Sequence, residues 1–175
     1  MVKLMSKEKS YSLSFVPPLE IYGKCSEIIN GLSLQYKSPK FEPHITLIPH
    51  AASSKEEVIE VTSQLAKNHR PFEIKLAGIE YFNEYFVCVF VRVEKSEELI
   101  SISNNARKIF KRANDPDYMP HLSLLYGTFS DEVKKGIVEK LGRQFNFSFT
   151  AKSISIFDTT GKPEEWKRIK EIFLG

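Results

Sequence analysis

The feature that most constrains the fold is an order of predicted elements that occurs twice. Apolar alternation predicts strands at residues 11–16, 43–48 and 72–76, and helical periodicity separates them at 21–32 and 54–65. From residue 86 the same order of strand, helix, strand, helix, strand returns, with His121 at the position that His44 has in the first half. Such a duplication predicts two similar lobes that face each other.

The second half is predicted from the same signals. Its elements are a strand at 86–91, a helix from Ser96 to Ile109, a strand at 121–125, a helix from Ser130 to Leu141 and a strand that starts at 145–149. Because the apolar parity changes to Ile154 and Ile156, we expect a bulge near Lys152 in that last strand. The periodicity of Trp166, Ile169 and Ile172 favours a C-terminal helix, with Trp166 packed in the core.

Length and composition exclude several classes of protein. The chain has 175 residues, a formal net charge of +3 and two cysteines, too few for a disulfide framework. Its longest apolar run, Phe86 to Val91, falls far short of the roughly 20 residues that cross a bilayer. No apolar signal segment is visible at the N-terminus. We therefore expect a soluble, cytoplasmic monomer with a single domain over 1–175, its lobes built from 11–80 and 84–175.

Two short motifs are the strongest functional signal. They are Pro43-His44-Ile45-Thr46-Leu47 and Pro120-His121-Leu122-Ser123-Leu124. On a strand, residues two apart project from the same face about 6.6–7 Å apart, so each histidine shares a face with its hydroxyl partner. A single motif of this kind is typical of a core histidine bonded to a neighbouring hydroxyl. Two at matching positions predict two histidines and two hydroxyls around one small volume.

That group of side chains suits phosphodiester hydrolysis without a metal. One neutral histidine removes a proton from water, and the other, protonated, donates to the departing ribose oxygen. The hydroxyls of Thr46 and Ser123 stabilise charge on the non-bridging oxygens. No carboxylate cluster accompanies His44 and His121, so the sequence implies neither a metal site nor another cofactor.

The twin motifs resemble those of the 2H phosphoesterase superfamily. The run from Tyr118 to Tyr126 resembles the eukaryotic cyclic phosphodiesterases in particular, and the likeness extends from Tyr11 to Trp166. It implies an α+β fold in which two antiparallel sheets with outer helices face a central cleft. It also implies hydrolysis of ADP-ribose 1″,2″-cyclic phosphate, which arises downstream of tRNA splicing, and of nucleoside 2′,3′-cyclic phosphates.

The resemblance also implies a role for each site residue. His44 and His121 are the acid–base pair, and Thr46 and Ser123 bind phosphate. The matching motifs allow either histidine to be the base, and the resemblance favours His121. Tyr126 corresponds to an aromatic residue beside the ligand, and we expect Tyr85 to line the same cleft. The first strand departs from the pattern, because Ser14 stands where a related plant enzyme carries a tryptophan, which puts base stacking in doubt. The family also ends in a strand, against the periodicity around Trp166.

Two rival functions remain open. In the first, the same residues act on RNA ends with 2′,3′-cyclic termini or 2′-5′ linkages, held by a basic helical face of Arg107, Lys108, Lys111 and Arg112. In the second, the chain binds a nucleotide without turning it over. The expected partner is a small cyclic-phosphate nucleotide, with RNA ends as the alternative and no membrane.

Overall fold

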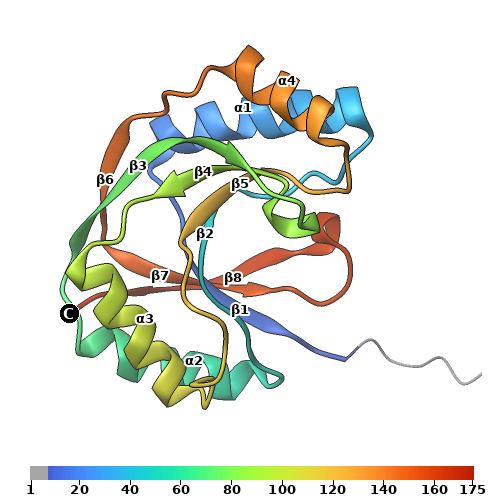
Figure 1. Cartoon of the computed structure of the whole chain (residues 1–175). Helices are drawn as coiled ribbons and strands as arrows, with labels where there is room; N and C mark the ends of the chain where they lie inside the picture. The colour runs from blue at the N-terminus through green and yellow to red at the C-terminus, as the bar shows by residue number, and fades with distance from the viewer. Residues whose placement is uncertain (1–7) are drawn as a thin grey trace, which may run out of the picture.

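Up to residue 151 the predicted order of strands and helices is confirmed in the computed structural model, which describes residues 8–175 (Figure 1). The elements are β1 (Tyr11–Phe15), α1 (Leu19–Tyr36), β2 (Ile45–Ala52), α2 (Lys55–Lys67), β3 (Phe72–Tyr81), β4 (Val89–Val93), α3 (Glu97–Ile109), β5 (His121–Leu125), α4 (Asp131–Leu141), β6 (Phe147–Ala151), β7 (Ser153–Asp158) and β8 (Lys167–Phe173), with short 3-10 turns η1 (Tyr85–Val87) and η2 (Pro163–Glu165).

Serine caps set the starts of three helices. The hydroxyls of Ser54, Ser96 and Ser130 accept hydrogen bonds from the backbone N–H three residues further on, at the starts of α2, α3 and α4. The longest helix, α1, has 18 residues and follows Pro18. Within residues 8–175, no helix combines the length and the apolar character needed to cross a membrane.

All eight strands belong to one antiparallel sheet, in the order β6-β3-β4-β5-β2-β1-β7-β8. The expectation of two separate sheets is therefore wrong. The reason is a narrow connection at the centre, where β2 and β5 pair through Ile45 and Leu122. This pair joins two four-stranded halves into one sheet, so the site lies on adjacent strands and not between opposed sheets. The internal duplication stays a prediction.

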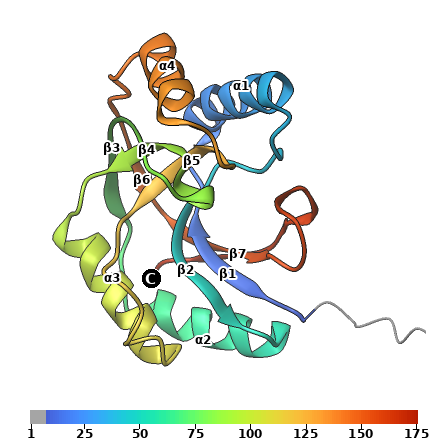
Figure 2. The same cartoon turned by 45° about the vertical axis from the view of Figure 1, so that its right-hand side comes forward.

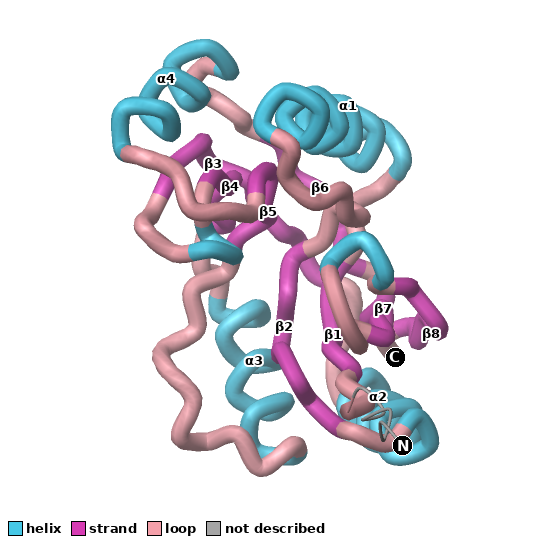
Figure 3. Tube along the Cα trace, turned by 90° about the vertical axis from the view of Figure 1, so that its right-hand side faces the viewer, coloured by secondary structure: helices cyan, strands magenta, loops and turns pink. Residues whose placement is uncertain are grey.

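Each four-stranded half of the sheet contains strands from both halves of the sequence. β3 pairs with β4 and β6, whereas β7 pairs with β1. The helices also pack on strands from the other half of the sequence: α1 packs on β5, and α3 packs on β2. As Figures 2 and 3 show, α1 lies with α4 at one end of the molecule and α2 with α3 at the other. The halves of the sheet thus do not coincide with residues 11–80 and 84–175.

The parity change at Lys152 has a different cause from the expected bulge. Lys152 alone separates β6 from β7, and these strands stand first and seventh in the sheet order. The sheet is therefore curled, so that its β6 edge comes close to β7 (Figure 1). Because the chain passes from one half of the sheet to the other at this residue, the side of each strand that faces the core changes.

Two segments near the site have a secondary structure other than the one that their apolar periodicity predicts. β4 begins at Val89 and not at Phe86, because residues 85–87 form η1, and this turn leaves the Phe86 side chain 50% exposed. The C-terminal segment is the strand β8, as the resemblance implied, and it pairs with β7. A strand places alternate residues on opposite faces, so Trp166 and Arg168 reach the same side of the sheet.

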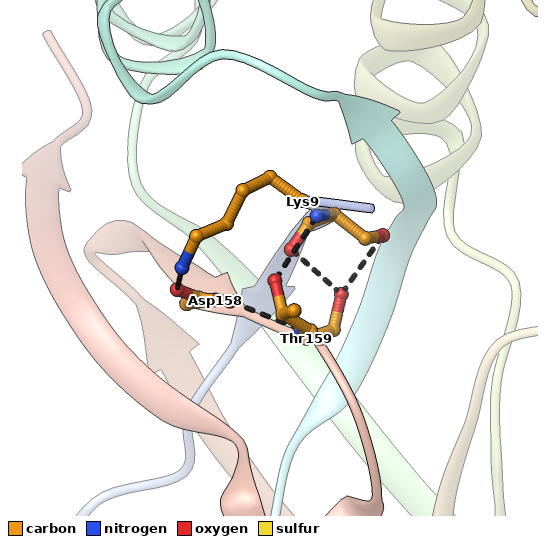
Figure 4. A network of polar contacts seen from close by, with 5 residues as sticks. Lys9, Asp158 and Thr159 are labelled. Atoms are coloured by element: carbon orange, nitrogen blue, oxygen red, sulfur yellow. Dashed lines mark hydrogen bonds and ion pairs between the residues drawn. The ribbon is translucent and has the colours of Figure 1, made fainter. Parts of the chain in front are cut away.

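A polar network fixes the start of β1 against the end of β7 (Figure 4). The Lys9 ammonium contacts Asp158 at 3.1 Å, and the backbone N–H of Thr159 donates to the Ser10 carbonyl at 2.8 Å. Asp158 in turn accepts from the N–H of Thr160 at 3.0 Å. These bonds fix the end of β7 next to Phe157, whose ring lies 5.2 Å from that of His44.

Candidate active site

The histidine motifs lie on the two strands that meet at the centre of the sheet. Ile45 of β2 pairs with Leu122 of β5. The antiparallel register from this pair sets His44 toward Ser123 and Thr46 toward His121, on the face opposite to the buried Ile45 and Leu122. The four side chains predicted to form the site therefore share one face of the sheet.

The two imidazoles have matching hydrogen bonds. His44 Nδ1 lies 2.6 Å from the carbonyl oxygen of Glu42, and His121 Nδ1 lies 2.8 Å from that of Met119. A carbonyl oxygen can only accept, so Nδ1 carries the proton in each ring. The basic nitrogen of each neutral ring is then Nε2, the atom left for chemistry. Both bonds run to the residue two positions earlier, as the matching motifs require.

Burial and neighbouring charges shift the pKa values of both histidines. Burial lowers the pKa of both His44 and His121, because an apolar surrounding disfavours the charged form. A positive charge on His121 lowers the pKa of His44 further, so the rings are close enough to interact. At His121 the carboxylate of Glu84 partly offsets the lowering of the pKa by burial. These charge interactions favour a proton on His121 and disfavour one on His44.

The hydroxyls of the two predicted phosphate ligands, Thr46 and Ser123, differ in their hydrogen bonds. The Ser123 hydroxyl, 5% exposed, donates to the Phe86 carbonyl at 2.8 Å, and the Tyr126 hydroxyl also interacts with it. The side chain of Thr46 makes no hydrogen bond within residues 8–175, although its backbone carbonyl accepts from Tyr118 at 3.0 Å. The Thr46 hydroxyl is therefore ready to donate to an anion, whereas that of Ser123 must first leave its carbonyl.

Aromatic rings surround this face. Tyr126 stacks on Phe41 with ring centroids 3.8 Å apart and is only 3% exposed. Tyr85 lies 6.3 Å from Tyr126 and is 44% exposed. Both tyrosines predicted beside the ligand are therefore near the site, but only Tyr85 offers an open ring face.

Trp166, which was expected in the core, lies beside His44 instead. Its ring centroid lies 6.3 Å from that of His44 and 6.1 Å from that of Phe86, with the Phe86 plane at 25°. The signal that could have found it was the implied C-terminal strand, which returns residues 166–168 to the sheet beside β7. Ser14, by contrast, is buried opposite Thr46 and offers no ring to a base.

The structure also bears on the metal and RNA alternatives. Within residues 8–175, no group of three or more histidine, cysteine, aspartate or glutamate side chains is placed to hold a metal ion. In the predicted basic face, Arg107 donates to the Pro116 carbonyl, while Arg112 contacts Asp115 at 2.9 Å and the His50 carbonyl at 2.8 Å. Both arginines therefore hold the loop before β5.

Comparison with known proteins supports a common family. Residues 24–163 match the family model described as the 2′-5′ RNA ligase superfamily. A cyclic phosphodiesterase of Arabidopsis thaliana is 25% identical over 134 residues, which cover 77% of this chain and 74% of the relative. A 2′,3′-cyclic-nucleotide 3′-phosphodiesterase of Candida albicans is 27% identical over 105 residues, 51% of this chain and 42% of the relative.

Solved structures share the fold. TT0787 of Thermus thermophilus superposes with a TM-score of 0.70 at 15% identity, covering 94% of this chain and 97% of its own. Escherichia coli LigT, crystallised with 3′-AMP, superposes with a TM-score of 0.64 at 16% identity, covering 97% and 99%. At these identities the likeness concerns the fold alone.

Proposed function

Because the chain belongs to the 2′-5′ RNA ligase superfamily, a group of phosphoesterases, we propose that it is an enzyme that hydrolyses cyclic phosphodiesters on ribose to phosphomonoesters. The proposed substrates are ADP-ribose 1″,2″-cyclic phosphate, opened to the 1″-phosphate, and nucleoside 2′,3′-cyclic phosphates, opened to the 2′-phosphate. The observation that most supports this is the pair of Nδ1–H bonds to Glu42 and Met119, which leaves two Nε2 atoms free on one face.

In the proposed reaction, the neutral imidazole accepts a proton from water as the water oxygen bonds to phosphorus. The bond from phosphorus to one ribose oxygen breaks, and the protonated imidazole donates its Nε2 proton to that oxygen. Thr46 and Ser123 donate to the non-bridging oxygens, where negative charge grows. The Glu84 carboxylate favours a proton on His121, and a charged His121 disfavours one on His44, so we propose His44 as the base and His121 as the acid, the reverse of the order that the resemblance implies.

The expected product makes a direct test. In buffer with an excess of EDTA, the purified protein should convert nucleoside 2′,3′-cyclic phosphate to the 2′-phosphate, because none of the proposed steps uses a metal. Phosphorus NMR distinguishes the cyclic ester from the 2′- and 3′-monoesters. Loss of activity in EDTA that Mg²⁺ or Zn²⁺ restores would contradict the metal-independent reaction. Nucleotide binding by calorimetry without any hydrolysis would support the rival binding module.

Trp166 is proposed to bind the nucleobase, which makes its removal a test of substrate recognition. Its ring and the half-exposed Phe86 are inclined by only 25°, beside His44. Base stacking on an aromatic ring contributes about 1–3 kcal/mol, so Trp166→Ala should raise KM about tenfold with little change in kcat. Phe173→Ala, which removes an exposed ring at the far end of β8, serves as the control. An unchanged KM for Trp166→Ala would remove this residue from the binding site.

RNA ends are the second candidate substrate. Two of the four basic residues proposed to hold the strand, Arg107 and Arg112, already bond to Pro116 and Asp115 in the loop before β5, which favours the small nucleotide. Competition by oligonucleotides against a cyclic mononucleotide at low and high salt separates the two. A strong, salt-sensitive advantage for the oligonucleotide would favour RNA.

A further inference from the structure

We propose that Arg168 is a positioning residue for His44 and acts through the side chain of Glu42. The proposal rests on the two-histidine reaction above and extends it to a residue that belongs to neither motif. It assigns a role to the C-terminal strand β8, which supplies Arg168 and follows Trp166.

The first step concerns the bond that orients His44. Its Nδ1–H donates to the carbonyl of Glu42 at 2.6 Å. Glu42 lies in the segment between α1 and β2, where no helix or strand fixes the direction of the peptide. Whatever holds Glu42 therefore also determines where the His44 ring points.

The second step concerns what holds Glu42. Its Oε1 atom is shielded from solvent and accepts no hydrogen bond from residues 8–175, yet it lies 3.0 Å from Nη2 of Arg168. Burial raises the pKa of Glu42, and Arg168 opposes this and stabilises the carboxylate. The Tyr22 hydroxyl of α1 interacts with the same carboxylate. Glu42 is thus held between α1 and β8, and Arg168 supplies the compensating charge.

The third step is the contrast with the other motif. Met119 has the position in front of His121 that Glu42 has in front of His44, and its carbonyl accepts the equivalent bond. Its side chain is apolar and 37% exposed, so it cannot form an ion pair. The ion pair therefore supports one histidine only, and its removal should change His44 and leave His121 as it is.

Steady-state kinetics test the proposal. Arg168→Ala should lower kcat about tenfold and leave KM within about twofold, because a misdirected ring slows proton transfer and leaves binding intact. Arg168→Lys keeps the charge near Oε1 and should recover part of kcat. Lys170→Ala, which removes an exposed basic residue of the same strand that pairs opposite Ile156 and not Phe157, is the matched control and should behave as the wild type. Unchanged kcat in Arg168→Ala would overturn the proposal.

A double-mutant cycle tests the route through Glu42. Glu42→Gln keeps the size and the backbone carbonyl but removes the charge. If Arg168 acts through this carboxylate, Arg168→Ala combined with Glu42→Gln should cost no more than the larger single effect. Effects that multiply would mean that the two residues act separately, which overturns the proposed route.

Histidine NMR supplies a readout that does not depend on turnover. In the wild type, ¹⁵N shifts should show His44 and His121 as Nδ1–H tautomers. Arg168→Ala should mix the tautomers of His44 and leave those of His121 unchanged, and no change at His44 would overturn the proposal. A wild type that hydrolyses nothing but shows this selective change would refute the proposed function and support the positioning role. Loss of activity in His44→Ala with no effect of Arg168→Ala would do the opposite.

Discussion

Replacing His44 or His121 by alanine is expected to lower kcat/KM by about 10²–10⁴-fold, the usual cost of removing a general acid or base. In each ring Nδ1 donates to a backbone carbonyl, so only Nε2 is left for the substrate. One ring therefore cannot act as both the acid and the base in the same step. His69→Ala is the matched control, because its ring bonds to Asn105 at the other end of the fold. Circular dichroism should show that the variants remain folded. A variant with near-normal turnover would remove that histidine from the mechanism.

The same variants distinguish the base from the acid. A nucleotide diester with a 4-nitrophenolate leaving group needs no proton from the enzyme at the departing oxygen. If His121 is the acid, His121→Ala should recover most of its rate on this substrate, and His44→Ala should not. The pH profile gives an independent test: the rate rises as His44 loses its proton and falls as His121 loses its own. The falling limb should then disappear in His121→Ala. The opposite pattern would make His121 the base, as the family resemblance implies.

Local signals in the sequence predicted much of this arrangement. Serine caps at Ser54, Ser96 and Ser130 act within one turn of their own helices, and strand alternation needs only neighbouring residues. The placing of His44 with Thr46, and of His121 with Ser123, follows in the same way, because residues two apart on a strand share a face. That the two motifs meet was predicted from their matching positions in the two halves and depends on the pairing of β2 with β5. The roles of these four side chains stay predictions, which substitution of each residue tests.

Long-range pairing could not be predicted from the same signals. Whether two four-stranded halves form two sheets or one depends on the bridge between Ile45 and Leu122, and both residues are simply apolar in the sequence. A parity change at Lys152 looks the same whether a strand bulges or the chain crosses to another part of the sheet. Trp166 and Arg168 reach the site only through the pairing of β8 with β7, so no local pattern marks them.

The two hydroxyls should differ in their effect on the rate, although the motifs treat them as equivalent. Thr46→Val removes a hydroxyl that no residue in 8–175 engages and should lower kcat by about 10²–10³-fold, as loss of a donor to a growing oxyanion does. Thr46→Ser keeps the donor and is the matched control. Ser123→Ala should cost less, about tenfold, because that hydroxyl must first give up its bond to the Phe86 carbonyl.

The order of these two effects matters more than their size. A phosphoryl group that reached both hydroxyls equally would make Ser123→Ala as damaging as Thr46→Val, and the existing bond to Phe86 would then be irrelevant to the reaction. If Ser123 mainly supports Phe86, its loss should raise KM for nucleotides, since Phe86 faces Trp166 where the base is proposed to bind. Measuring kcat and KM separately for Thr46→Val, Thr46→Ser and Ser123→Ala decides between these cases. Equal losses of kcat in Thr46→Ser and Thr46→Val would show that the Thr46 hydroxyl is not the donor.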